Sequence, residues 1–166
     1  MQTPYRKKET YIQPKADPHI TPEKFTALSA KLKRMVEIDR PRLSREVKHL
    51  ASMGDFSENA GYQLAKGRLR GLNQRILDAE DLMKRAEIIM PRQNNDLVGL
   101  GHSVTVEING KLKTYKILGS TETDPLSGII SHSSPLGAAL LGHKIGDIVS
   151  VVLNDRTVEY KIIKID

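Results

Sequence analysis

Two carboxylates, Asp55 and Glu58, lie three residues apart in the stretch MGDFSEN, residues 53–59. Mg²⁺ prefers oxygen ligands and takes one or two protein carboxylates, usually alongside phosphate oxygens. Two acids on one turn could therefore complete a Mg²⁺ site whose other ligands belong to a partner. In a two-metal phosphodiester site they would recruit the second ion and orient the attacking water. A structural reading stays open, because acids at a helix start stabilise its positive end by about 0.3–1 kcal/mol.

The stretch that follows the acids has the spacing of a coiled-coil helix. Apolar residues recur at intervals of three and four without a miss, which predicts one continuous packing seam. The seam residues are Tyr62, Ala65, Leu69, Leu72, Ile76, Ala79, Met83 and Ala86.

The stretch that precedes the acids predicts the antiparallel partner of this helix. Thr21 is placed to cap its start and Pro22 to occupy its first turn. Pro41 is expected to kink or restart the helix, because proline removes a backbone donor. The apolar positions of this arm are Phe25, Leu28, Leu32, Met35, Leu43, Val47 and Leu50.

Residues 21–90 are thus predicted to form a coiled-coil hairpin with an acidic tip at residues 54–59. Gly54 can end the first helix in a left-handed conformation, and Ser57 can cap the second. Arms of about 30 residues would reach roughly 45 Å at 1.5 Å per residue. Asp55 and Glu58 would then lie at the far end of a rod.

Positive charge is concentrated on this hairpin. Residues 40–75 carry eight Lys and Arg against three acids, whereas residues 98–166 carry seven of each sign. Such a bias indicates a surface that meets a polyanion or an acidic partner, although a solvated helix face is the simpler alternative.

The rest of the chain predicts an extension, a linker and a small β-rich domain. Residues 1–20 contain three prolines and scattered charges, and residues 91–101 have the composition of a linker. Residues 102–166 predict two β-hairpins, a further short strand and a helical turn capped by Ser134, with Asn109–Gly110 as a type I′ turn. The predicted class is α+β, with an antiparallel sheet and one short helix.

Several classes of chemistry are disfavoured by the composition. The chain has no cysteine, so neither a disulfide framework nor a thiolate site is available. The five histidines show no metal-ligand spacing, so we expect them on the surface or in the core. Ser134 has no nucleophile elbow around it. The N-terminal twenty residues lack the apolar segment of a secretory signal.

Two separated motifs resemble the bacterial Gre family of transcript cleavage factors, GreA and GreB. GDFSENAGYQLAK at residues 54–66 resembles the tip signature of the family, and ISHSSPLGAALLGHKIGD at residues 130–147 resembles its Ser–Pro loop. RPRLSREVKHLASMGD resembles the first arm, and KGRLRGLNQRI resembles the basic start of a GreB-type second arm. The resemblance covers roughly residues 21–166.

The resemblance implies a fold and a mechanism. Gre factors have an N-terminal coiled coil and an FKBP-like C-terminal domain that docks on RNA polymerase, while the coiled coil enters the secondary channel. The tip acids, here Asp55 and Glu58, stabilise the second Mg²⁺ of the polymerase, and backtracked RNA is then cut endonucleolytically. The chain would not be an enzyme by itself, and the free protein would hold no Mg²⁺.

Further roles carry over by position. The resemblance implies that Lys66, Arg68 and Arg70 meet the nascent RNA 3′ segment, and that the polymerase-docking loop holds Ser131, Ser133 and Pro135. It implies a monomer in the bacterial cytoplasm and no membrane partner.

The sequence departs from the family pattern at three positions. A third tip acid is replaced by Gly61, the Arg after Ser–Pro–Leu–Gly by Ala138, and an Asp or Asn by Ser133. Gly61 keeps open an alternative function, a channel-binding regulator that does not stimulate cleavage. A prolyl isomerase is a third hypothesis, but Tyr115 and Tyr160 are the only aromatics of residues 102–166, too few for such a pocket.

Overall fold

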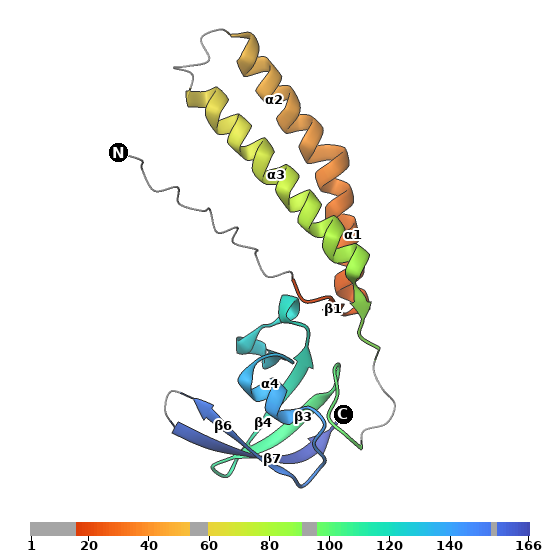
Figure 1. The fold of residues 1–166 in the computed structure, drawn as a ribbon, viewed down its shortest axis with the longest axis vertical. Helices are drawn as coiled ribbons and strands as arrows, with labels where there is room; N and C mark the ends of the chain where they lie inside the picture. The colour runs from red at the N-terminus through yellow and green to blue at the C-terminus, as the bar shows by residue number, and fades with distance from the viewer. Residues whose placement is uncertain (1–15, 54–59, 91–95, 154–155) are drawn as a thin grey trace, which may run out of the picture.

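The computed structural model describes residues 16–53, 60–90, 96–153 and 156–166. A long helical hairpin projects from a domain built around a five-stranded sheet (Figure 1). The predicted α+β class is confirmed, and so is the order of hairpin first and sheet second. Among the described residues, no helix is both long and apolar enough to span a bilayer.

The first arm of the hairpin consists of two α-helices joined by a wider turn. Helix α1 (Pro22–Arg34) leads into the π-helical segment η1 (Met35–Asp39), and α2 (Arg40–Ser52) follows. Thr21 caps α1 as predicted, since its Oγ1 accepts the Lys24 N–H at 3.2 Å. The Arg40 N–H donates to the Met35 carbonyl, a five-residue step that gives the chain room for Pro41. The predicted restart at this proline is confirmed.

The second arm is one helix, α3 (Ala60–Arg85), whose packing stripe follows the predicted seam. Ala65, Leu72, Ile76 and Ala79 are buried, and the other four seam residues are half-buried. Across the interface they meet Met35 of η1 and apolar residues of the first arm, namely Leu28, Leu32, Val36 and Leu43. The 3.6-residue period therefore places one narrow apolar stripe of each arm in contact.

A short parallel strand pair closes the base of the hairpin, where β1 (His19–Ile20) pairs with β2 (Glu87–Ile88). Ile20 is fully buried. The sequence analysis did not foresee this pair, because two residues are too few to show a strand period. The structure describes the predicted extension only from residue 16 onward.

The C-terminal domain is a sheet in the order β5-β4-β3-β7-β6. Its strands are β3 (Ser103–Ile108), β4 (Lys111–Leu118), β5 (Ile129–Ser131), β6 (Ile148–Leu153) and β7 (Arg156–Ile165). Both predicted hairpins are present, β3–β4 and β6–β7. Positive φ angles at Asn109 (50°) and Gly110 (74°) fit the predicted type I′ turn. The expected all-antiparallel sheet differs in one pairing, since β5 joins β4 in parallel through a long connection.

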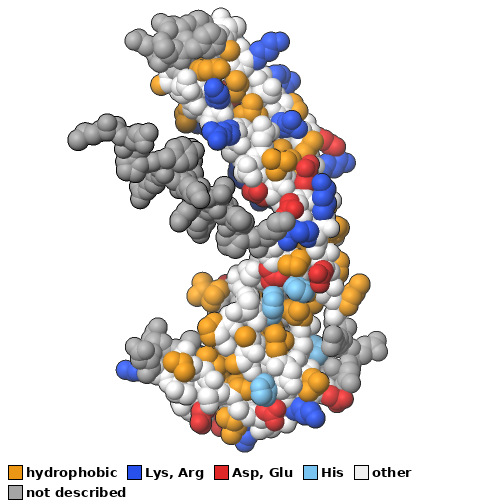
Figure 2. Space-filling model, viewed as in Figure 1, with side chains coloured by type: hydrophobic (Ala, Val, Ile, Leu, Met, Phe, Trp, Pro, Cys, Tyr) orange, Lys and Arg blue, Asp and Glu red, His pale blue; other side chains and the backbone are white. Residues whose placement is uncertain are grey.

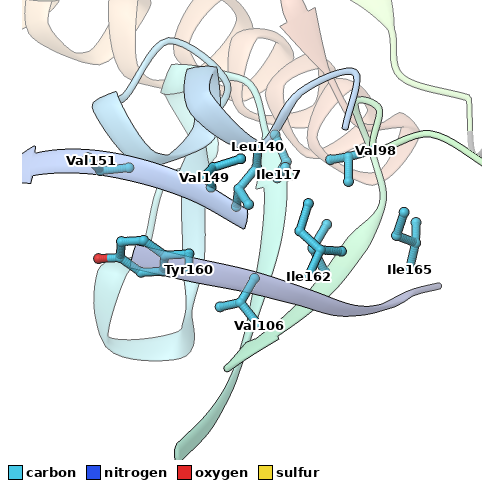
Figure 3. Close-up of a cluster of buried hydrophobic side chains, with 10 residues drawn as sticks. Val98, Val106, Ile117, Leu140, Val149, Val151, Tyr160, Ile162 and Ile165 are labelled. Atoms are coloured by element: carbon cyan, nitrogen blue, oxygen red, sulfur yellow. The ribbon is translucent and has the colours of Figure 1, made fainter. Parts of the chain in front are cut away.

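The core of this domain lies between the sheet and helix α4 (Pro135–Leu140). Figure 3 shows Leu140 among the valines and isoleucines of β3, β4, β6 and β7. Buried residues alternate along β7 at Tyr160 and Ile162. A register shift between β3 and β7 then adds one residue, so the next buried position of β7 is Ile165. Val98, inside the predicted linker, also belongs to this core at 3% exposure.

Hydrogen bonds fasten the base of the hairpin to the C-terminal domain. The Thr21 N–H and hydroxyl donate to the two carboxylate oxygens of Glu122, at 2.6 and 2.8 Å. The Ser120 N–H donates to Asp17 Oδ2 at 2.7 Å. Gly119 lies so close to the His19 carbonyl that a Cβ there would overlap it. The direction of the rod is therefore set at its base.

We predict that the seam carries most of the hairpin stability. Leu72→Ala removes a side chain that is 3% exposed and should cost about 2–4 kcal/mol in the free energy of unfolding. Leu77→Ala, on the same helix but 58% exposed, is the matched control and should change it by about 0.5 kcal/mol or less. Urea denaturation of both variants checks this, and equal losses would contradict a one-sided seam.

Candidate functional site

The two arms join at the end of the hairpin that lies away from the sheet (Figure 1). Helix α2 ends at Ser52, whose hydroxyl donates to the His49 carbonyl at 2.7 Å, and α3 begins at Ala60. Asp55 and Glu58, the predicted metal-site acids, lie in this connection but outside the described residues. Gly54 and Ser57, predicted to end and cap the helices, lie outside them as well. These roles stay predictions.

The three basic side chains predicted to meet RNA do not share one face of α3. Lys66 and Arg70 are exposed neighbours, one helical turn apart, and the Lys66 Nζ lies 5.9 Å from the centre of the Tyr62 ring. Arg68 turns toward the first arm, where its Nη1 lies 3.7 Å from Glu46 Oε1. Lys66 and Arg70 are like charges four residues apart, and such a pair weakens a helix by about 0.2–0.5 kcal/mol. A polyanion beside Lys66 and Arg70 would remove that repulsion.

A second group of cations surrounds a hollow of ≈ 300 Å³ at η1. Lys31, Arg34, Arg42 and Arg75 line it around a single acid, Asp39. Asp39 lies 3.9 Å from Arg34 Nε and 3.6 Å from Arg42 Nη2, so it offsets part of the charge. Figure 2 shows Lys and Arg along the hairpin. Basic side chains therefore lie both near the start of α3 and around η1.

The predicted docking loop is a tightly hydrogen-bonded turn between β5 and α4. Ser131 is buried, and its Oγ lies 2.8 Å from Ser133 Oγ and accepts the Ser133 N–H at 3.1 Å. The Ser134 hydroxyl donates to the Ser131 carbonyl at 2.6 Å and accepts the Gly137 N–H at 3.1 Å. This geometry confirms the helical turn capped by Ser134. Of the three predicted loop residues, Ser133 and Pro135 are exposed, whereas Ser131 is buried and stabilises the turn through its hydrogen bonds.

The structure also brings together a group that the sequence analysis missed. Asp17, His19 and His132 offer ligand atoms that all lie within 4.8 Å of one another, at the junction of the hairpin and the sheet domain. His19 and His132 are more than a hundred positions apart in the sequence. No spacing rule could have found them, and only the docking of the hairpin base on the sheet domain makes them neighbours.

Two family models match the chain. Residues 19–88 match "Transcription elongation factor, N-terminal", and residues 93–166 match "Transcription elongation factor, GreA/GreB, C-term". The chain is 38% identical over 148 residues to transcription elongation factor GreA of Thermomicrobium roseum, covering 88% of this chain and 95% of the relative. It is 38% identical over 151 residues to GreA of Leuconostoc citreum, covering 89% of this chain and 94% of that relative.

Among solved structures, the chain is similar to GreA factor homolog 1 of Thermus thermophilus. The identity is 27%, the match covers 86% of this chain and 94% of that one, and the TM-score is 0.40.

We predict that the loop before α4 requires Gly137. A Cβ at this position would overlap the Ser131 carbonyl oxygen, so Gly137→Ala should cost about 1–3 kcal/mol of stability. Gly67→Ala is the matched control, because the added methyl group meets open space and should stabilise α3 by about 1 kcal/mol. Thermal unfolding of both variants checks the opposite signs, and a stable Gly137→Ala would refute the tight turn.

Proposed function

We propose a mechanism for this chain from the premise that it belongs to the GreA/GreB family of transcription elongation factors. Both family models match, and together they span almost all of residues 19–166. We propose that the chain binds RNA polymerase through its C-terminal domain and inserts the hairpin into the secondary channel. There it stimulates endonucleolytic cleavage of backtracked RNA by the polymerase, so it is not an enzyme on its own.

The observation that carries the proposal is the shape of the hairpin. Helix α3 has 26 residues and so a length of about 39 Å, its buried residues run from Ala65 to Ala79, and it contacts both α1 and α2. A rod of this kind presents whatever lies in its terminal connection to a site deep inside a partner. The connection between α2 and α3 contains Asp55 and Glu58.

The donor set suits Mg²⁺, which prefers carboxylate oxygens and binds firmly only when further ligands complete its shell. Asp55 and Glu58 would hold the ion jointly with the polymerase active site, so we expect none on the free chain. When bound, Mg²⁺ supplies a Lewis acid for the phosphodiester and activates the attacking water. The contribution of this chain is two oxygen ligands and two negative charges, held in place by the paired arms.

The basic side chains of α3 would position the RNA. Lys66 and Arg70 are exposed, so they can meet phosphates of the displaced 3′ segment. Phosphate contacts of this kind fix the position of a nucleic acid without reading its sequence. Arg68, paired with Glu46, would contribute by holding the arms together or by exchanging this partner for a phosphate.

Docking would use the exposed side of the loop before α4. Ser133 and Pro135 are exposed on a turn whose shape is fixed by Ser131 and Ser134, so the surface is formed before the partner arrives. We expect the chain to act as a monomer in the bacterial cytoplasm, where RNA polymerase works.

The proposal is tested with a backtracked elongation complex carrying 5′-labelled RNA and Mg²⁺. Wild-type protein should shorten the RNA, whereas Asp55→Asn combined with Glu58→Gln should not. The amides keep the shape of the side chains and remove the charge that a cation needs. The time course of RNA length is the measurement.

Two controls separate a metal role from folding and from docking. Glu37→Gln, an exposed acid on the first arm, should leave cleavage unchanged. The double amide variant should still bind polymerase and unfold at the temperature of the wild type. Cleavage that survives in the double variant would refute the donated metal site.

A second function, channel binding without stimulation of cleavage, is favoured by Gly61. This residue is exposed in the first turn of α3 and stands where the family has a third acid. We predict that Gly61→Glu raises the rate of cleavage, because it adds a negative charge near the tip. Gly61→Ala is the control, since it gives α3 about 1 kcal/mol of helix propensity without the charge. If wild type binds polymerase but only Gly61→Glu supports cleavage, the chain is a channel-binding regulator.

A further inference from the structure

Three side chains from two parts of the molecule converge at the base of the hairpin. Asp17 and His19 come from the segment that enters the first arm, and His132 follows strand β5 of the sheet domain. His19 Nδ1 lies 2.8 Å from Asp17 Oδ1, and His132 Nδ1 lies 3.3 Å from Asp17 Oδ2. The two imidazole rings stand edge to face with their centres 5.1 Å apart.

These separations are those of ligands around one transition-metal ion. Zn²⁺ binds imidazole nitrogen and carboxylate oxygen at about 2.0–2.1 Å, so neighbouring ligand atoms of a tetrahedral site are about 3.3 Å apart. The separations at Asp17 are 2.8 and 3.3 Å, and all three ligand atoms fall within 4.8 Å. The two separations involve different oxygens of Asp17, so an ion would lie between this carboxylate and the two rings.

Glu87 supplies an outer carboxylate of the kind that metal-bound histidines use. It lies opposite His19 in the β1–β2 register, and its Oε2 is 3.4 Å from His19 Nε2. A neutral imidazole that binds a metal through Nδ1 carries its hydrogen on Nε2, where it can donate to such an acceptor. Glu87 would thus select the tautomer of His19 that leaves Nδ1 free for the ion.

The burial of the group also favours a ligand. The Asp17 side chain is only 11% exposed, and those of His19 and His132 are 31% and 24% exposed. His132 Nδ1 is buried and makes no hydrogen bond with any described residue, so Asp17 Oδ2 at 3.3 Å is a charged neighbour and not a hydrogen-bond partner.

We propose that Asp17, His19 and His132 form a binding site for a divalent transition metal, with Zn²⁺ as the best-suited ion, that fastens the hairpin to the C-terminal domain. Two ligands belong to the entry of the first arm and the third to the sheet domain, so one ion would cross-link the two parts. The fourth position of the tetrahedron would be left to water. This site is separate from the tip acids and does not depend on the proposed function.

Calorimetric titration of metal-free protein with ZnCl₂, without a histidine tag, tests the proposal. We expect one Zn²⁺ per chain in the wild type and at least a tenfold weaker affinity in His132→Gln and in His19→Gln. His143→Gln is the matched control, because His143 Nδ1 lies 3.2 Å from Asp147 Oδ2 in an exposed pair that no third potential ligand joins among the described residues. It should bind as the wild type does. Co²⁺ in place of Zn²⁺ should give the visible absorption of a tetrahedral site, and His132→Gln should lose it.

A second readout follows the junction itself. The chain contains no cysteine, so spin labels can be placed at Leu77→Cys on α3 and Lys161→Cys on β7, both exposed. Zn²⁺ should narrow the distribution of distances between them, and it should not do so in His132→Gln. The absence of saturable binding in wild type, or equal binding in a folded His132→Gln, would overturn the proposal. If one of the two histidine variants does not unfold cooperatively, the Zn²⁺ affinity of the other variant decides between the two outcomes.

Discussion

The direction of the rod depends on a few hydrogen bonds at the point where the chain enters the first arm. The backbone and hydroxyl of Thr21 bind both oxygens of Glu122, and Asp17 accepts the Ser120 N–H. Thr21 is also the cap of α1, so the same residue starts the helix and fixes it to the sheet domain. Because α3 is about 39 Å long, a small change of angle at the base becomes a large displacement at the far end of the helices.

The hairpin combines a continuous core with one local irregularity. A proline inside a helix removes a donor and clashes with the preceding turn. The π-helical turn η1 accommodates the missing donor and the ring of Pro41. Met35, which begins η1, is itself buried against Leu72 and Ile76. The seam therefore continues past the irregularity. The same turn carries Asp39, around which cations from α1, α2 and α3 gather, so the adjustment that keeps the core intact also lies at the basic surface.

The charge and the core of this family member are divided between its two parts. The hairpin carries the positive surface and the acids of its terminal connection, while the sheet domain is balanced in charge and holds the larger core. Such a division suits an elongation factor of the GreA/GreB type, in which one part would be held by the partner and the other would reach into it. The junction between the parts holds Asp17, His19 and His132, the residues of the proposed metal site.

Much of this protein is determined by local sequence. The seam of α3, the cap at Thr21, the break at Pro41, the type I′ turn at Asn109–Gly110 and the helical turn after Ser134 follow from spacing and residue type, because each depends on neighbours within a few positions. The tertiary structure alone decided the parallel pairing of β5, the burial of Ile20 and Val98, and the separation of Arg68 from Lys66 and Arg70. It also brought His19 and His132 together. These features depend on contacts between residues far apart in the chain, and no local period or propensity records which distant segments will pack against each other.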